Sequence, residues 1–477
     1  MGTGVAGMIW VLAAYAGLRL CFWFWAPPNP DEAYYWLWGQ RGQFSYYDHP
    51  PLFAWLQGIV TAIAGQSLGG LRFLNLITNG VLFFTYGALL RYLYGYGGRR
   101  CWLPLITLVL ASPVFWVMLS LAWHDHLAIA LTIVSGYFLL CYLDAYREWG
   151  HGSFWHLTGG LVAIALATIT KYNMAFFALA VLGMVASDRR LRRLLWTWPM
   201  IYGLVIGAIA WSPVLWWNFQ NNWASFSFYV TRSANSGSIG MRLTEPLSFV
   251  GISLVMFSPV TAMAWSRVHF FDGRRDTCYP AIAQWGFWLP TLTLLVVSAA
   301  STAYYYWNVM AYLLVFPLII PWLMRQKRWW WAIHSWGMLF ALLFTLNHCW
   351  LPLSAFFTAE GDRDGRLHFG WAEVVAALPA EEWQRPLFTT DYRTAALLGY
   401  ALKTPDIGTL SQRISQFTLW QRSPKSGSLI TLLADDWHPL NDQVAAKVAD
   451  LRVLKAVPIV RSGIMLKTYT LYQGRWR

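Results

Sequence analysis

Ionisable side chains collect in one aromatic stretch near the N-terminus. Asp31 and Glu32 follow an Asn-Pro pair, and Asp48 and His49 precede a Pro-Pro pair. A carboxylate in this setting can take a proton from an attacking hydroxyl, and basic groups can stabilise a leaving phosphate. The alternative for Asp31 and Glu32 is that they only complement the dipole at a helix start. Their grouping with Asp48 and His49 on one segment favours chemistry.

Two further positions carry charge inside apolar surroundings. His124-Asp125-His126 begins one apolar run, and Lys171 stands where two short apolar runs meet. Lys171 needs an anion nearby, either a carboxylate of this protein or a substrate phosphate, unless it only extends to the membrane surface. Asp125 is a candidate to join the first cluster, and its alternative is a helix cap. The three adjacent residues 124–126 make a poor metal site by themselves, because neighbours on a helix point in different directions.

Amides and aromatic rings gather at several segment ends. Trp217-Asn218 and Asn308, with the tyrosines of the first stretch, have the side chains that stack on sugars and hydrogen-bond their hydroxyls. The alternative is an ordinary aromatic belt at a membrane surface.

The composition places these residues in a membrane protein. The 477 residues are 57% hydrophobic and only 12% charged, whereas an ordinary globular protein is about 25% charged. The net charge of +13 does not indicate nucleic acid, because the arginines sit in short links between apolar runs. The five scattered cysteines lack the spacing of a metal site or of a disulfide framework.

Apolar runs of roughly 20 residues predict membrane-spanning helices. Eleven candidates occur, at 5–26, 71–93, 101–119, 125–143, 157–171, 172–187, 194–216, 247–266, 282–300, 309–324 and 329–350. Most arginines of the short links fall on one side, which predicts a cytoplasmic N-terminus. All the polar clusters then face the opposite, periplasmic side. This placement favours chemistry at the outer membrane surface over a transmembrane ion path.

The C-terminal part is more polar. Apolar strands at 387–390 and 428–433 alternate with helical patterns at 392–402 and 440–450, which predicts a small α/β domain. We therefore expect a transmembrane catalytic domain over 1–352, with a periplasmic first loop at 27–70, and a periplasmic domain over 353–477.

The motif Asp31-Glu32-Ala33-Tyr34-Tyr35-Trp36, with Tyr46-Tyr47-Asp48-His49-Pro50-Pro51, resembles the first external loop of bacterial membrane glycosyltransferases related to protein O-mannosyltransferases. That group includes the lipid A aminoarabinose and galacturonic acid transferases. Asp125, Lys171-Tyr172, 213–218, 223–226 and Tyr392-Arg393 with Tyr400 follow in the expected order, so the resemblance covers nearly the whole chain. The aminoarabinose transferases carry a lysine where this chain has His49 and an arginine where it has Tyr34.

The resemblance implies a GT-C fold and an inverting transfer, in the bacterial inner membrane, of a sugar from a polyprenyl-phosphate donor to lipid A, core or another envelope glycan. A protein acceptor, or a glycolipid flippase or transporter without this chemistry, are the alternatives. We expect Asp31, as base, Glu32 and Asp125 at the reacting centre. The expected donor-phosphate ligands are Lys171, His49, Arg72 and Arg393. The expected sugar or acceptor contacts are Asp48, Tyr34, Tyr35, Tyr47, Asn218, Trp217 and Asn308. A divalent cation, if one is used, would be held among Asp31, Glu32, Asp48, His124 and Asp125.

Overall fold

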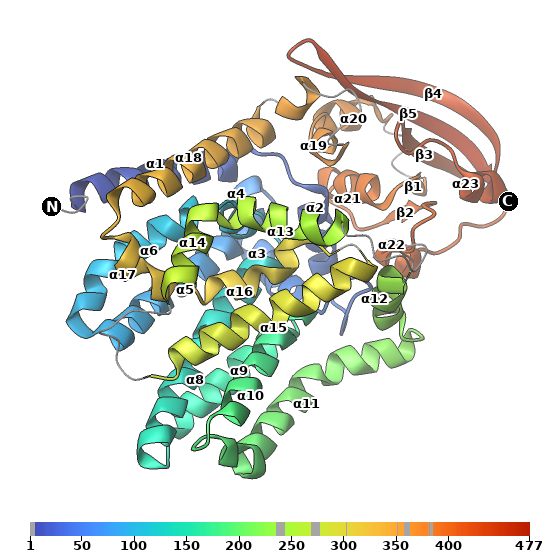
Figure 1. The fold of residues 1–477 in the computed structure, drawn as a ribbon. Coiled ribbons are helices and arrows are strands. Elements are labelled where there is room, and N and C mark those ends of the chain that lie inside the picture. Colours follow the sequence, from blue (N-terminus) through green and yellow to red (C-terminus); the bar gives the residue numbers. More distant parts are fainter. Residues whose placement is uncertain are drawn as a thin grey trace. The chain divides into compact units, whose positions relative to one another are not determined.

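A computed structural model describes residues 5–234, 244–268, 277–301, 303–350, 352–356, 363–379, 381 and 385–477 (Figure 1). The chain forms two compact units. The first contains residues 1–18, 49–52 and 75–342, and the second contains 19–48, 53–74 and 343–477. Most of the first loop, except residues 49–52, thus belongs to the same unit as the C-terminal segment. The predicted domain boundary at residue 352 stays a prediction.

The first unit is helical. It holds most of α1 (Val5–Trp25), α5 (Phe73–Tyr94) and α18 (Lys327–Cys349). Its other elements are η1 (Gly95–Gly97), α6 (Gly98–Ala111), α7 (Pro113–Ser120), α8 (His124–Trp149), α9 (Phe154–Thr168), η2 (Tyr172–Met174), α10 (Ala175–Ser187), η3 (Arg192–Trp196), α11 (Trp198–Gln220), α12 (Ala224–Ala234), α13 (Thr244–Phe257), α14 (Pro259–Arg267), α15 (Tyr279–Ala300), η5 (Tyr305–Asn308), α16 (Val309–Leu313) and α17 (Phe316–Leu323).

Among the described residues, six helices are long and apolar enough to cross a membrane, or up to eight if two bent helix pairs each count as one span. Three shorter apolar helices, 52–64, 154–168 and 172–187, accompany them. α11 leaves Ile201, Leu204 and Ile209 exposed, which suits a helix that faces lipid. The predicted membrane class is confirmed, while the number eleven stays a prediction.

Two predicted straight spans are bent. The segment expected over 247–266 turns by 91° between α13 and α14, and the segment over 309–324 turns by 67° before α17. Ser258 has a left-handed backbone (φ 82°) and precedes Pro259, so the helix cannot continue there. The span expected over 101–119 is likewise interrupted before Pro113.

The second unit joins a small mixed sheet to short helices: α2 (Pro30–Gln40), α3 (Leu52–Ala64), α4 (Leu68–Leu71), η6 (Leu353–Phe356), α19 (Arg363–Leu367), α20 (Trp371–Ala377), α21 (Tyr392–Ala401), α22 (Gln416–Trp420) and α23 (Asp442–Lys447). The strands are β1 (Leu387–Thr389), β2 (Ile407–Thr409), β3 (Leu429–Asp435), β4 (Val448–Arg461) and β5 (Ile464–Trp476), in the order β2-β1-β3-β5-β4.

The predicted small C-terminal α/β domain is confirmed. β1 and β3 pair in parallel, with Phe388 opposite Leu432, and α21 lies against β1 and β2 (Figure 1). Phe388, Ile430 and Trp476 share a buried core. The predicted helix over 440–450 is wrong at its end, because 448–450 begins β4, which pairs along its length with β5. Cross-strand pairing therefore overrides the helical pattern.

Candidate active site

The helix α2 carries Asp31 and Glu32 in its first turn. Asn29 is its N-cap and accepts from the Asp31 N–H, while the Glu32 carboxylate accepts from the Asn29 N–H at 2.9 Å. This capping box, with Pro30 in the first turn, fixes where the helix begins. Glu32 is fully buried, whereas Asp31 is half-buried. Asp31 is therefore the carboxylate of this pair that a substrate can reach.

Glu32 is held by Arg72. The Arg72 Nε and Nη2 atoms donate to the two Glu32 oxygens, each at 2.8 Å. Arg72 also donates to the carbonyls of Phe22 and Ala26 at the end of α1, and only 1% of Arg72 is exposed. A bidentate buried pair of this kind fixes the turn between α1 and α2. The catalytic role of Glu32 and the phosphate-binding role of Arg72 stay predictions.

Asp48 meets an arginine that the sequence did not indicate. Arg413 Nη2 lies 2.8 Å from Asp48 Oδ1, and its guanidinium covers the ring of Tyr392 at 4.1 Å. Burial and the charge of Asp48 raise the pKa of the Tyr34 phenol, although a hydrogen bond from the Gln416 N–H opposes them. Asp48 is 5% exposed, and the charge of Arg413, which lies over the Tyr392 ring, balances its own.

The charges of Asp31, Asp48 and Arg413 all act on the phenol of Tyr392. Burial raises the pKa of the Tyr392 phenol, and the charge of Asp31 adds to the effect while that of Arg413 opposes it. Asp31, Asp48, Arg413 and Tyr392 therefore share one electrostatic environment. Arg413 lacks a motif around it and comes from a segment far along the chain, so no local signal could have found it.

Arg393 is held by a series of polar side chains on or next to the sheet. Its Nη2 atom lies 2.8 Å from His438 Nε2, and His438 Nδ1 lies 3.0 Å from Asp435 Oδ1. A guanidinium can only donate, so His438 Nε2 accepts and its Nδ1–H donates to Asp435. Lys467, fully buried, lies 3.3 Å from the second Asp435 oxygen. Arg393 is thereby oriented at the start of α21.

The pKa values of the buried pair follow from these contacts. Burial alone would raise the pKa of the Asp435 carboxyl, but the hydrogen bond with His438 and the charge of Lys467 hold it well below its ordinary value. Burial lowers the pKa of the Lys467 ammonium to about 8 against the opposing charge of Asp435. The ionised pair is the stable form at neutral pH.

The first unit brings together Asp125 and Lys171. Lys171 Nζ lies 2.6 Å from Asp125 Oδ1, and both side chains are buried. Lys171 has an extended backbone (φ −153°) where α9 ends and η2 begins, so the break between the two short helices directs it inward. Its ammonium also lies 5.4 Å from the centre of the Tyr306 ring. The anion that the sequence required is therefore Asp125.

His49 lies in the same unit beside two aromatic side chains. Its ring centre is 4.1 Å from that of His124, and its Nδ1 atom is 3.2 Å from the Tyr229 hydroxyl. The Leu52 N–H donates to the Ile169 carbonyl at 3.1 Å, which ties the Pro-Pro segment to the break before Lys171. The segment that carries His49 is thus hydrogen-bonded to the chain just before Lys171.

The expected sugar-binding amides are buried and engaged. Asn218 donates to the Val214 carbonyl and accepts from the Ser225 N–H, which joins α11 to α12. Asn308 donates to Thr291 and to the Tyr312 hydroxyl. Trp217, Tyr35 and Tyr47 are each less than a tenth exposed. Sugar binding by these residues stays a prediction.

Metal ligands were expected, conditionally, among the same carboxylates and His124. In the part of the chain that the structure describes, no group of three or more His, Cys, Asp or Glu side chains is placed to hold a metal ion. The expected set comes from both units, so it stays a prediction.

Comparison with known proteins identifies the class. A structure of ArnT from Cupriavidus metallidurans matches 98% of this chain and 98% of its own length, with a TM-score of 0.60 and 13% identity. This likeness shows the GT-C fold. The family model described as dolichyl-phosphate-mannose-protein mannosyltransferase matches residues 48–217. Together with the relatives below, these matches confirm the predicted class: the chain is a bacterial GT-C membrane glycosyltransferase.

Two curated relatives come from Rhizobium johnstonii. The lipid A galacturonosyltransferase RgtD is 26% identical over 403 residues, which is 78% of this chain and 77% of the relative. The lipopolysaccharide core galacturonosyltransferase RgtA is 26% identical over 284 residues, which is 57% of this chain and 52% of the relative. The chain is similar to both.

Proposed function

We propose that this enzyme transfers a sugar from a polyprenyl-phosphate donor to a hydroxyl of lipid A or core glycan, at the periplasmic face of the inner membrane. The names of the two relatives support galacturonic acid as the sugar. The partly exposed Arg413 suits a substrate carboxylate, which a guanidinium binds well.

The observation that carries the proposal is the difference between Asp31 and Glu32. Glu32 is buried, and both of its carboxylate oxygens accept hydrogen bonds from Arg72. Asp31, by contrast, is half-buried beside Tyr392 and Arg413. We propose Asp31 as the general base. It takes the proton of the acceptor hydroxyl while that oxygen attacks the anomeric carbon, and the bond from this carbon to the phosphate oxygen breaks. Polyprenyl phosphate leaves with the bonding electrons, and one displacement inverts the anomeric centre.

The leaving phosphate needs positive charge rather than a proton. We propose Lys171 and His49 for this task, with Asp125 holding the Lys171 ammonium in place. Glu32 and Arg72 then act through structure, because their mutual pairing positions the start of α2. Arg393, oriented by His438, is proposed as a further contact for an anionic group of the substrate.

Mass spectrometry of lipid A and core from cells that lack this chain tests the proposal. Complementation with the unaltered chain should restore a galacturonic acid mass, and Asp31→Asn should not, since loss of a general base costs about 10²- to 10⁴-fold in rate. Asp442→Asn is the matched control, because Asp442 is also an acid in the first turn of a helix. Restored transfer by a stably inserted Asp31→Asn would remove Asp31 as the base.

A further inference from the structure

Positive charge is concentrated in the first unit where α10 ends and α11 begins. Four exposed arginines fall within five consecutive residues of this connection: Arg189, Arg190, Arg192 and Arg193. We call this group the arginine loop. The connection over 188–197 has a single acidic residue, Asp188. The arginine loop therefore carries a net positive charge.

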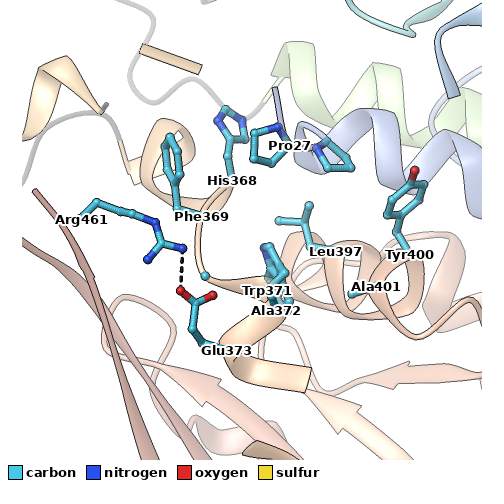
Figure 2. Close-up of a pocket in the computed structure, with 12 residues that line it drawn as sticks. Pro27, His368, Phe369, Trp371, Ala372, Glu373, Leu397, Tyr400, Ala401 and Arg461 are labelled. Atoms are coloured by element: carbon cyan, nitrogen blue, oxygen red, sulfur yellow. Dashed lines mark ion pairs between the residues drawn. The ribbon is translucent and has the colours of Figure 1, made fainter. Parts of the chain in front are cut away.

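The Asp188 carboxylate is engaged by an arginine outside this loop. It lies 3.3 Å from the Arg147 guanidinium near the end of α8, and it accepts from the Arg190 backbone N–H at 2.7 Å. Among the residues that the structure describes, none of the four side chains of the arginine loop forms an ion pair. By contrast, the partly exposed Arg461 of the second unit pairs with Glu373 at 2.6 Å (Figure 2). The charge of the arginine loop is therefore available to an anion from outside the chain.

The short helix η3 directs the charged residues outward. Leu191 and Leu194 are buried, so this side of the chain packs against the helices of the unit. Side chains three residues apart in a 3₁₀ helix lie on the same face, which aligns Arg193 with Trp196. Trp196 is 90% exposed. An indole ring with this exposure suits the headgroup region of a membrane, where tryptophan is enriched.

The neighbouring helices place the arginine loop at a membrane surface. α11 is a candidate span that begins at Trp198, two residues after Trp196. Trp198 is 55% exposed, and its ring lies 6.3 Å from that of Phe154 at the start of α9. Trp155, the next residue of α9, is 76% exposed. These aromatic rings mark the depth of the lipid headgroups, so the adjacent arginines lie at the depth of the lipid phosphates.

The arginine loop is separate from the proposed donor-phosphate ligands. Lys171 precedes α10, whereas Arg189 follows it. The 13 residues of α10 span about 20 Å at 1.5 Å per residue. An anion bound at the arginine loop is therefore not the phosphate that leaves during transfer, and this site does not depend on the proposed function.

We propose that the arginine loop binds the phosphate groups of anionic phospholipids, with the rings of Trp196 and Trp198 beside the headgroups. A guanidinium donates two parallel hydrogen bonds to phosphate oxygens. Each basic residue near an anionic membrane surface strengthens binding roughly fivefold. A zwitterionic lipid carries a cation on the same headgroup, which opposes this attraction. The loop therefore selects lipids with a net negative charge.

Photolabelling of the full-length protein in nanodiscs tests this selection. Two probes carry the same diazirine in one acyl chain, one on phosphatidylglycerol and the other on phosphatidylcholine, and mass spectrometry locates the adducts. We expect the peptide that contains Trp196 and Trp198 to prefer the phosphatidylglycerol probe at least about tenfold. Val296, an exposed apolar residue of the candidate span α15, reports the ratio for bulk lipid.

Two pairs of substitutions provide the controls. Arg192→Gln with Arg193→Gln should lower the preference at least about fivefold, while the other two arginines keep the connection basic. Arg192→Lys with Arg193→Lys keeps the charge and should retain most of the preference. Arg99→Gln with Arg100→Gln removes the same charge from two exposed residues of another connection, so it should not change the ratio at Trp196.

Two results would overturn the inference. One is the same ratio of the two probes at Trp196 as at Val296, which would show contact with membrane lipid of any charge. The other is an unchanged ratio in the Arg192→Gln/Arg193→Gln protein, which would limit these arginines to setting the orientation of the chain. Sugar transfer is measured on the same samples. Selective labelling of a protein that transfers no sugar supports the lipid site and counts against the proposed function alone.

Discussion

The pairing of Glu32 with Arg72 gives the sharpest prediction about stability. Arg72→Met removes the two charge-assisted hydrogen bonds at 2.8 Å and leaves a carboxylate with no exposed surface unpaired. It also removes the donor for the carbonyls of Phe22 and Ala26. Breaking a buried ion pair on one side costs about 3–5 kcal/mol, so we expect destabilisation near the upper end of this range.

A double variant tests whether Glu32 and Arg72 act by pairing with each other or by contacting the substrate. Glu32→Gln with Arg72→Met removes both charges, so it should be more stable than Arg72→Met by about 1–3 kcal/mol, the usual cost of a buried group left unpaired. Thermal unfolding of the purified protein in detergent, followed by tryptophan fluorescence, measures both effects. An Arg72→Met protein that unfolds like the original, yet binds the donor weakly, would refute this reasoning and assign Arg72 to the phosphate.

Three other predictions follow from the remaining clusters. Lys171→Ala should weaken donor binding about 10- to 100-fold, as expected for a lost charge-assisted contact, and unchanged donor affinity in a direct binding assay would reassign Lys171 to holding Asp125. Arg413→Lys keeps the charge but loses the planar contact with Tyr392, so kcat/KM for transfer should fall about tenfold. Equal kcat/KM would exclude a directional role for the guanidinium. The pKa of Asp435 is depressed in the folded state, so its stabilisation is complete above its unfolded pKa of about 4 and is lost as the pH falls further. The unfolding temperature should therefore decrease below about pH 4, and less steeply in Asp435→Asn; parallel curves would show that this carboxyl is not the cause.

Local patterns were sufficient for elements that depend on near neighbours. Asn29-Pro30-Asp31-Glu32 predicts a helix start because the capping partners lie within four residues. Long apolar runs predict the membrane class because an exposed backbone is costly in lipid. The helix α21 was expected at 392–402 and is found at Tyr392–Ala401 for the same reason, a continuous helical pattern.

The β4–β5 hairpin and the bends within two apolar runs were not predicted. β4 and β5 form one antiparallel pair whose register is set across the hairpin, and this pairing converts 448–450 from the expected helix into strand. The turns at Ser258 and before α17 interrupt runs that are apolar throughout, so hydropathy alone reports continuous spans.

The sequence by itself determined that this chain is a membrane protein, and it limited Lys171 to pairing with an anion or extending to the membrane surface. The types and spacing of neighbouring residues fix these properties. Only the tertiary structure decided that Arg72 saturates Glu32, that Arg413 meets Asp48, and that His438 orients Arg393. The paired residues lie 40, 365 and 45 positions apart, and which distant charges meet is set by the packing of whole elements rather than by any local pattern.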